Sequence, residues 1–446
     1  MTEPADRPIT HARVARIALP VVLSNAAVPI QGAIDTAIVG NLGDAVYLAA
    51  VTLGATVITL LFTSFNFLQM GVSGLTAQAL GAGDRRRVVN TLVRALILAG
   101  LVALALNMLS GTVARAGLAL FAGSAEAEGL AAAYLQIRIL GAPAELANYA
   151  LIGWFTGQEL TRRLFEMQVV TSLANVAFNL VFVFGFGWGV EGVALGTVLG
   201  AYCGLAVGLL RVRLRLGALM PGGFRPEWRR ILDPGELAGV MALNRDIFIR
   251  TVCLTVGFAW MARLGSIQGD TVLAANGVLM QFLHVSAYAL DGFAMAAETL
   301  VGQALGRGSR ARLRRAVRVT SVSALILAAA FSAAATALSG RLVALFTNVP
   351  EVRAVAMAHV LWATCMPLAG VLAYQLDGIF IGAAEGRQMR DAMLVSAALY
   401  LPIGWALTTA LGNDGLWLAL WIWMLARAGT LALRYPRIEA RTRLLC

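Results

Sequence analysis

The sequence contains no lysine and few charged residues of any kind. All 35 basic residues are arginines, and charged residues make up 13% of the 446 residues, about half the share found in a typical soluble domain. Hydrophobic residues make up 59%, and the mean hydropathy is +0.76. The length would allow about three soluble domains, but no soluble arrangement could bury so much apolar surface. The composition therefore excludes soluble catalytic domains.

Residues that build catalytic or metal sites are also scarce. The three histidines and four cysteines show neither the spacing of metal ligands nor that of a disulfide framework. No nucleophile–base arrangement and no phosphate-binding glycine loop stands out. The sequence therefore predicts no enzyme, no catalytic residues, no bound metal and no cofactor. The first ten residues lack the basic region and cleavage site of a signal peptide, so we expect no removed leader.

Long stretches of the chain carry no charge. They lie between Asp44 and Asp84, between Arg318 and Arg341, and between Asp391 and Asp414. Since a membrane helix needs only about 20 apolar residues, each stretch can span a bilayer. The apolar runs between charges and Gly/Pro breaks predict twelve spans: 14–40, 46–79, 90–111, 129–156, 165–186, 191–215, 237–263, 271–304, 316–339, 353–382, 391–411 and 414–434. The predicted fold class is an all-α polytopic membrane protein.

The two halves of the chain match each other at an offset of 225 residues. The matched pieces are TAQALGAG (76–83) with VGQALGRG (301–308), Gly153-x-Phe155-x-Gly157 with Gly378-x-Phe380-x-Gly382, and, after a slip of two residues, Glu191-Gly192 with Asp414-Gly415. Because each half has six spans, an even number, both insert in the same orientation, related by a pseudo-two-fold axis along the membrane normal. We predict an N-terminal six-helix lobe at 1–215, a cytoplasmic linker at 216–236 and a C-terminal six-helix lobe at 237–446. This is transporter architecture.

The arginines gather in the loops of one side of the predicted bundle. Arg85 to Arg87, Arg211 to Arg230 and Arg307 to Arg318 form clusters, whereas the opposite loops hold isolated arginines such as Arg115. By the positive-inside rule, both termini are cytoplasmic. The net charge of +11 is then a topology signal and not a nucleic-acid surface. The compact loops fit a bacterial inner (plasma) membrane.

The first predicted span contains a carboxylate at membrane depth. Asp35 lies 19 residues after Arg16, and Gln31 precedes it by one turn on the same face. Pro29 removes one intrahelical hydrogen bond and provides a bend. Since a carboxylate withdrawn from water takes up a proton more readily, Asp35 is a candidate for proton or cation coupling. The alternative is that Asp35 only faces a wet vestibule near the interface.

Further polar side chains lie in the fifth and sixth predicted spans. Asn175 and Asn179 stand one turn apart on a single face, and Thr197 could face them. We assign these residues, with Asp35 and Gln31, to the ion-coupling site. The alternative is that the amides only hold neighbouring helices together.

The eighth predicted span carries a polar stripe. His284, Asp291 and Glu298 are spaced by seven residues and so share one helix face, with Tyr288 and Met295 a turn away. We interpret these five residues, together with Asp377 in the tenth span, as lining a substrate cavity. The alternative is that the charged ones pair with buried charges such as Asp246, Arg250 or Asp377. Asp246 and Arg250, at i and i+4, are expected to pair with each other.

Several of these residues lie in motifs that resemble the multidrug and toxic compound extrusion (MATE) family, specifically its DinF-like branch. The resemblance covers essentially the whole chain. It rests on Asp35-Thr-Ala-Ile-Val-Gly40-Asn-Leu-Gly43, Gly81-Ala-Gly83, Leu243-Asn-Arg-Asp-Ile-Phe248, Asp291-Gly-Phe-Ala294 with Glu298 and Gly302-Gln303, and Asp377-Gly-Ile-Phe-Ile-Gly382. It implies secondary efflux driven by an inward proton or sodium gradient. It also implies that Asp35 matches the family's essential acidic residue in the amino-terminal lobe and that Asn175 and Thr197 match its polar neighbours.

One position departs from the family pattern. Where proton-coupled archaeal relatives carry a second carboxylate one turn after the fifth-span asparagine, this chain has Asn179. A relay of two carboxylates in this lobe is therefore not available. Asp35 would act alone or with Asp291 and Glu298 of the other lobe. A carboxylate beside amides and a hydroxyl could hold Na⁺ as well as a proton, since hard cations prefer oxygen ligands.

The sequence thus predicts a secondary transporter that exports amphipathic, often cationic, organic compounds by antiport with H⁺, with Na⁺ as the second choice of ion. Its expected partners are a small-molecule substrate, H⁺ or Na⁺ and membrane lipid, without nucleic acid, and we expect a monomer. The alternative function is a lipid-linked precursor flippase of the same superfamily. That function would need a strongly basic central cavity, and few arginines lie inside the predicted helices: Arg138, Arg245, Arg250 and Arg427. A receptor or scaffold would leave the repeat and the buried Asp35 unexplained.

Overall fold

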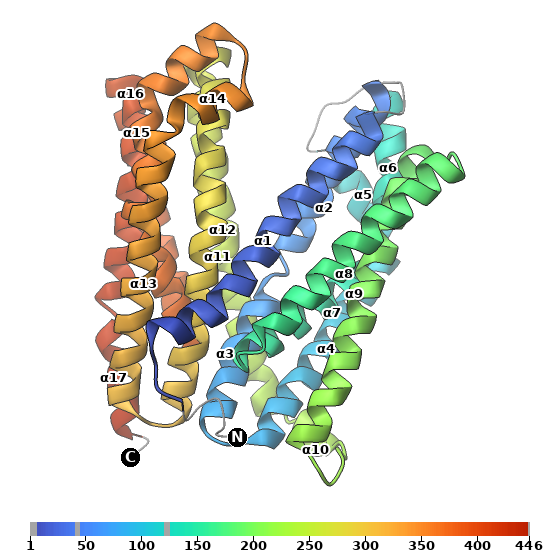
Figure 1. The fold of residues 1–446 in the computed structure, drawn as a ribbon, viewed down its shortest axis with the longest axis vertical. Coiled ribbons are helices and arrows are strands. Elements are labelled where there is room, and N and C mark those ends of the chain that lie inside the picture. The colour runs from blue at the N-terminus through green and yellow to red at the C-terminus, as the bar shows by residue number, and fades with distance from the viewer. Residues whose placement is uncertain (1–6, 41–44, 120–124, 445–446) are drawn as a thin grey trace. The chain divides into compact units, whose positions relative to one another are not determined.

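The computed structural model describes residues 7–40, 45–119 and 125–444 (Figure 1). Within these ranges all regular secondary structure is helical, and no strand occurs among them. The last three residues of the Asp35–Gly43 motif, 41–43, lie outside the described residues, as does Cys446. The predicted all-α membrane fold is confirmed.

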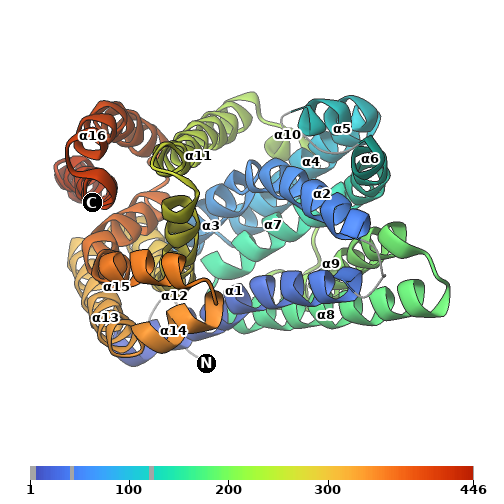
Figure 2. The same ribbon diagram turned by 90° about the horizontal axis from the view of Figure 1, so that it is seen from above.

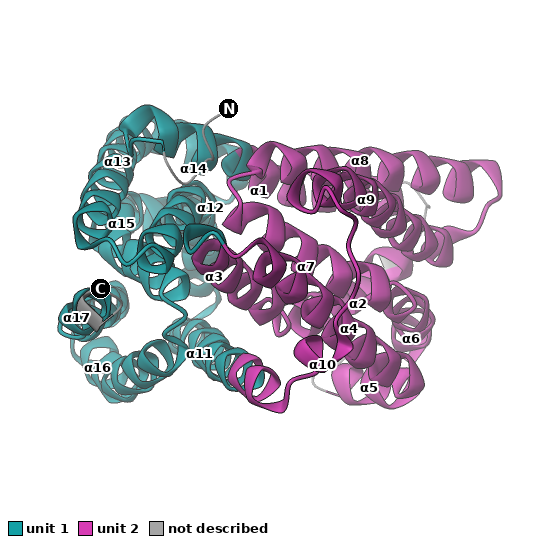
Figure 3. Ribbon diagram, turned by 90° about the horizontal axis from the view of Figure 1, so that it is seen from below, with its two compact units in different colours: residues 1–22, 80–83, 241–446 teal, residues 23–79, 84–240 magenta. Residues whose placement is uncertain are grey.

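The described chain divides into two compact units (Figure 3). One comprises residues 23–79 and 84–240 and is called unit 2, and the other comprises residues 1–22, 80–83 and 241–446 and is called unit 1. The predicted division into two functional lobes, 1–215 and 237–446, joined by a linker at 216–236, stays a prediction.

Each helix from the first half of the chain lies wholly or mostly in unit 2. These are α1 (His11–Gly40), α2 (Ala45–Thr63), α3 (Phe67–Gly81), α4 (Arg85–Met108), α5 (Ser110–Leu118), α6 (Ala125–Ile139), α7 (Ala142–Gly157), α8 (Thr161–Leu180), the π-helical turn η2 (Val181–Gly185), α9 (Gly189–Leu219) and the short α10 (Trp228–Ile231). Within this unit α8 and α9 run side by side along most of their length (Figures 1 and 2).

Each helix from the second half of the chain lies wholly or mostly in unit 1. These are α11 (Pro234–Ile267), α12 (Asp270–Gly306), α13 (Arg310–Ala337), α14 (Ser339–Phe346), α15 (Pro350–Gly382), α16 (Gly386–Ala432) and α17 (Tyr435–Leu444). The most extensive helix–helix contact in this unit is between α12 and α15. Its apolar core gathers around Tyr400, Trp417 and Trp423, which are fully buried.

The structure accounts for the twelve predicted spans. Among the described residues ten helical segments are long and apolar enough to cross a membrane. One of them, which contains α16, holds two of the predicted spans, joined at Gly412, whose φ of 59° is a left-handed conformation that favours glycine. The span predicted at 129–156 is built by α6 and α7, which meet at Leu140 and Gly141. Large apolar side chains on the outside, such as Met108 at 75% exposed and Leu361 at 61%, are suited to contact with lipid.

The internal repeat appears in how the helices pack. In each half, both glycines of the Gly-x-Phe-x-Gly motif lie so close to a neighbouring helix that a Cβ atom would collide with a backbone carbonyl. The contacts pair Gly153 with Gln69, Gly157 with Ser73, Gly378 with Ala294 and Gly382 with Glu298. Because the partners are also 225 residues apart, the same α3–α7 contact recurs as α12–α15. Glycine stands at these positions because the backbones touch.

Two short helices also repeat, and the sequence did not predict them. Both α5 and α14 begin with Ser-Gly after a leucine, and the backbone angles of that leucine are alike. Leu109 has φ −100° and ψ 11°, and Leu338 has φ −98° and ψ 2°. The two halves therefore share this break, whereas the breaks between α2 and α3 and between α6 and α7 have no counterpart in the continuous α12 and α15.

Candidate ion and substrate site

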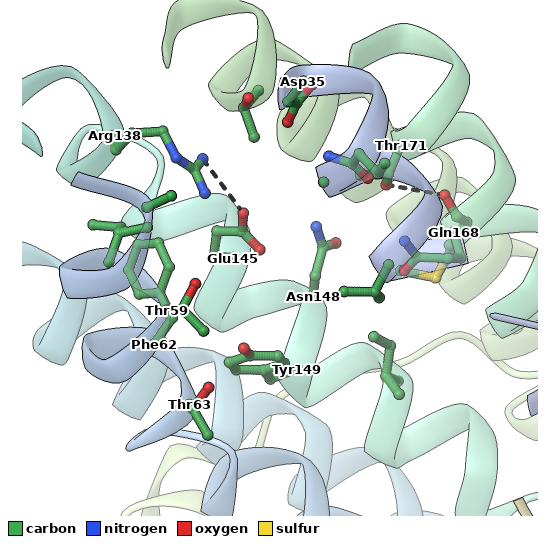
Figure 4. Close-up of a pocket in the computed structure, with 18 of the residues that line it drawn as sticks. Asp35, Thr59, Phe62, Thr63, Arg138, Glu145, Asn148, Tyr149, Gln168 and Thr171 are labelled. Carbon is green, nitrogen blue, oxygen red and sulfur yellow. Dashed lines mark hydrogen bonds and ion pairs between the residues drawn. The ribbon is translucent and has the colours of Figure 1, made fainter. Parts of the chain in front are cut away.

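A cavity of about 370 Å³ lies within unit 2, enclosed by α1, α2, α6, α7, α8 and α9 (Figure 4). Its lining combines apolar side chains such as Phe62 and Met167 with polar ones such as Asp35 and Gln168. A cavity of this size, mostly apolar with a few directed polar groups, suits a small organic ligand.

Asp35 lines this cavity from α1. Its Oδ1 accepts a hydrogen bond of 2.7 Å from Nδ2 of Asn179 on α8. One turn earlier on α1, Oε1 of Gln31 accepts a 3.1 Å bond from the hydroxyl of Ser172 on α8. Two consecutive turns of α1 are thus tied to α8 by polar side chains.

Asn175 and Thr197 form the next layer of this polar row. Asn175 Nδ2 donates to the Thr197 hydroxyl at 2.9 Å, and that hydroxyl donates to the carbonyl of Val193 at 2.9 Å. Asn175 and Asn179 are fully buried. The structure brings the five proposed ion-coupling residues into one connected region, and their role in coupling stays a prediction. The described part of α1 continues helically through Pro29, whose role as a bend also stays a prediction.

A row of glycines on α9 lets α8 come close, and sequence reasoning missed it. Glycine recurs every four residues at 192, 196, 200, 204 and 208. At Gly196 a Cβ atom would collide with the side chain and backbone of Asn179, and at Gly200 it would touch Asn175. The spacing of small residues was the available signal. The two asparagines therefore reach their positions because α9 has no side chains there.

Two charged residues on another wall of the cavity were also not assigned to the site. Arg138 on α6 and Glu145 on α7 point toward one another, and 3.8 Å separates Arg138 Nη1 from Glu145 Oε1 (Figure 4). Asn148, one turn after Glu145, lines the same cavity and donates from Nδ2 to the carbonyl of Ala201. The signal in the sequence was an arginine and a glutamate inside one apolar run.

The five residues proposed as substrate lining on α12 belong to unit 1. His284 and Tyr288 are exposed, Asp291 is half-buried, and Met295 and Glu298 are buried. The cavity around Asp35 is lined by residues of unit 2. Their role in substrate binding stays a prediction.

Asp377, the sixth residue proposed for that lining, is held by two buried arginines. Its Oδ2 accepts hydrogen bonds from Arg250 on α11 and, at 2.8 Å, from Arg427 on α16. The predicted pair between Asp246 and Arg250 is wrong. Asp246 instead accepts from Arg390 of α16 at 2.8 Å, because helices packed in tertiary structure supply a closer partner than the next turn does. Asp377 is therefore a paired, buried charge, and its role in substrate binding stays a prediction.

The polar row of unit 2 has an aromatic counterpart in unit 1. At the repeat offset of 225, the positions of Asp35, Asn175 and Asn179 correspond to Trp260, Tyr400 and Gly404. The Trp260 ring lies against Gly404, so the corresponding pair is in contact in both halves. Tyr400 stacks on Trp423 with ring centroids 4.7 Å apart. Aromatic side chains thus occupy two of these three positions in unit 1, and the third is a glycine.

Comparisons with known proteins agree with this architecture. The MatE family model matches residues 20–181 and 247–406. The chain is 37% identical over 439 residues to the DNA damage-inducible protein F of Escherichia coli K12, covering 97% of this chain and 92% of the relative. It is 30% identical to a probable multidrug resistance protein NorM of Bradyrhizobium diazoefficiens, covering 96% and 93% of the two chains.

The fold is shared with a solved transporter. The outward-facing structure of a multidrug resistance MATE family transporter of the MOP superfamily superposes with a TM-score of 0.87 at 18% identity, covering 99% of this chain and 98% of that one. The resemblance to the DinF-like branch is confirmed by the Escherichia coli relative. The chain therefore belongs to the MATE family of multidrug efflux transporters, which are integral membrane proteins and not enzymes.

Proposed function

We propose that this transporter exports amphipathic organic compounds, often cationic ones, in exchange for protons that bind at Asp35. The observation that carries the proposal is the Asp35–Asn179 hydrogen bond inside the cavity of unit 2. A carboxylate at membrane depth needs a functional reason. Here it faces a space large enough for a substrate and is tied to α8 by a hydrogen bond that is stronger when the carboxyl group is charged.

The neighbours of Asp35 favour a proton over Na⁺. Asn179 turns its NH₂ group, a donor, toward the carboxylate. Asn175 likewise donates from its NH₂ group to the hydroxyl of Thr197, and that hydroxyl donates to the backbone carbonyl of Val193. The guanidinium of Arg138 lines the same cavity. Since Na⁺ is repelled by a nearby cation, Arg138 supports proton coupling. The oxygens that Na⁺ would use instead are Oδ1 of Asn175 and Oδ1 of Asn179, which have no hydrogen-bond partner among the described residues.

The proposed transport cycle follows if the proton and the cationic substrate bind the Asp35 carboxylate in turn and never together. In the outward-open state Asp35 takes a proton and becomes neutral, which weakens its hydrogen bond with Asn179 and its attraction for a cation, so α1 rearranges and the substrate leaves. In the inward-open state Asp35 releases the proton and binds the cationic group of the next substrate. Each ligand shifts the equilibrium only by its different affinity for the two states. A membrane potential of 100 mV supplies about 2.3 kcal/mol for each imported charge.

We further propose that the protein acts as a monomer in a bacterial inner membrane with both termini in the cytoplasm. The arginine-rich segments support this orientation by the positive-inside rule. One of them, between α9 and α11, lies beside α4: Arg94 donates to the carbonyls of Arg230 and Ile231 and pairs with Glu236 at 2.9 Å. The bacterial origin of the similar proteins named above supports the choice of membrane.

The test uses purified protein in liposomes and measures ethidium movement under an imposed pH gradient, then under a sodium gradient. We expect flux with the pH gradient and loss of at least about tenfold in Asp35→Asn, because a neutral amide cannot alternate between proton and cation. Asp270→Asn, the same change at an exposed position on α12, is the matched control. Normal flux in Asp35→Asn would refute the coupling role of Asp35. Flux driven by the sodium gradient would refute H⁺ as the coupling ion. Failure of both gradients would favour the flippase.

A further inference from the structure

A second cavity, of about 410 Å³, lies within unit 1 as a groove lined by α13, α15 and α16. The helices α13 and α16 lie on either side of α15 and both pack against it (Figure 3). At one end Tyr435, the first residue of α17, also lines the groove, and α17 contacts both α13 and α16 there. The proposed transport cycle does not use this groove.

The lining of the groove is almost entirely apolar. Side chains such as Leu376 and Ile379 of α15 form its floor. Leu372 and Leu425 also line it and are 53% and 52% exposed. Exposed leucines on membrane-spanning helices are suited to contact with lipid. The groove therefore opens toward the hydrocarbon of the bilayer.

The wall formed by α16 carries small residues at a place where no other helix packs. Ala428, Gly429 and Ala432 line the groove, and a Cβ atom added to Gly429 would have no atom within 4 Å. Small residues in membrane helices usually let two backbones touch, as Gly378 and Gly382 do in this unit. At Gly429 no backbone comes close, so the space is left for a narrow apolar group.

Positive charge gathers at the end of the groove that α17 closes. Arg310 and Arg314 of α13 both donate to Oε2 of Glu439 on α17 at 2.9 Å, so two guanidinium groups share one carboxylate. Arg318, one turn after Arg314, is exposed and forms no ion pair among the described residues. Val317, which lies between these two arginines in the sequence, lines the groove. An excess of positive charge therefore stands at the end of an apolar slot.

We propose that this groove binds an anionic phospholipid, with one acyl chain between α13 and α16 and the phosphate at Arg314 and Arg318. The groove follows α16 from Leu425 to Ala432, about 10 Å, which fits within the ~15 Å of hydrocarbon in one leaflet. Apolar contact alone gives little preference over the surrounding lipid, so the arginines select the anionic headgroup. A second copy of the chain bound through the same groove would bring its own arginines close to these, and the like charges would repel.

The test counts bound lipid by native mass spectrometry on protein purified in detergent. The protein is titrated with dioleoylphosphatidylglycerol, which is anionic, or with dioleoylphosphatidylcholine, which has the same chains and no net charge. Gly429→Leu fills the groove, and Gly100→Leu on α4 is the matched control, since a Cβ atom there also has no atom within 4 Å. Arg318→Gln removes one charge from the end of the groove, and Arg341→Gln, at an exposed position on α14, is its control.

We expect the unmodified chain to bind phosphatidylglycerol more tightly than phosphatidylcholine. Gly429→Leu should weaken phosphatidylglycerol binding at least about tenfold, because the leucine side chain and an acyl chain cannot occupy the same space. Arg318→Gln should weaken it about fivefold and leave phosphatidylcholine unchanged, since it loses one basic side chain at an anionic headgroup. Neither control should change either affinity. If Gly429→Leu does not fold, the contrast between the two lipids in Arg318→Gln decides the matter.

Four results would overturn the assignment of this lipid site. Equal affinity for the two lipids would mean that only ordinary surrounding lipid binds. Phosphatidylglycerol binding that a folded Gly429→Leu keeps would place the lipid elsewhere. Displacement of the lipid by an equal concentration of glycerol 3-phosphate would mean that the arginines bind a free phosphate and that the groove holds no chain. A dimer that Gly429→Leu dissociates would mean that a second copy fills the groove. Lipid binding does not involve Asp35, so the proposed antiport and this site can fail independently.

Discussion

Replacing Gly196 by alanine tests whether the close contact of α8 and α9 sets the coupling site. The added methyl would stand 2.9 Å from the backbone nitrogen of Asn179 and 3.0 Å from its Cγ. Rotation of the side chain cannot relieve the contact with the backbone nitrogen. Since ordinary contacts begin near 3.5 Å, α8 has to withdraw by about 0.5 Å.

That displacement has a predictable effect on stability and on coupling. Overpacking of this kind destabilises by about 1–3 kcal/mol, and the helix preference of alanine over glycine returns about 0.5–1 kcal/mol, so we expect a net loss of about 1–2 kcal/mol. The same movement lengthens the 2.7 Å bond from Asn179 to Asp35. A hydrogen bond to a charged group contributes about 1.5–3 kcal/mol, so proton-driven flux should fall about tenfold.

The assay combines thermal unfolding in detergent with dye flux in liposomes under a pH gradient. Gly217→Ala is the control, because it makes the same change on α9 at a position with no atom within 4 Å of the new methyl. Asn179→Ala removes the amide without forcing the helices apart, so it should lose flux and keep more stability. If Gly196→Ala matches Gly217→Ala in both measurements, helix spacing does not position Asn179 and the reasoning is wrong.

Two further predictions concern the core of unit 1. Asp377→Ala leaves Arg250 and Arg427 buried without their shared carboxylate and should destabilise by about 3–5 kcal/mol in thermal or denaturant unfolding, whereas a loss below about 1 kcal/mol would mean that the arginines find other partners. Tyr400→Phe should be neutral or slightly stabilising, because the buried Tyr400 hydroxyl has no hydrogen-bond partner among the described residues, while Tyr400→Ala should cost about 3–5 kcal/mol through loss of the stack on Trp423. Equal effects of the two Tyr400 substitutions would contradict the packing argument.

The sequence predicted the site best where local geometry decides it. Asn175 and Asn179 had to share a face because they are one turn apart, and the structure places that face against Asp35. Spans were predictable because apolar length is read directly from the chain. Even the break inside α16 was placed correctly, since Gly412 and the following polar residues interrupt the apolar run.

Prediction failed where a distant helix decides the partner. Asp246 and Arg250 are one turn apart, yet each finds an opposite charge on another helix, and no local rule says which. The run at 129–156 looked like one helix, which hid that Arg138 and Glu145 lie on opposite sides of the break between α6 and α7. The glycine row on α9 was visible in the sequence, but its meaning depends on which helix packs there.

Comparison of the two halves shows that only the first has a carboxylate at the position of Asp35. Both halves keep the same backbone contacts at their Gly-x-Phe-x-Gly motifs, so each inherited the same helix framework. In the second half Trp260 replaces the carboxylate, and Tyr400 stacked on Trp423 occupies the place of Asn175 packed on Gly200. Such a stack excludes water, and a charge inserted there would have no partner. If transport uses Asp35, the corresponding position of the second half, Trp260, has no group that can take a proton.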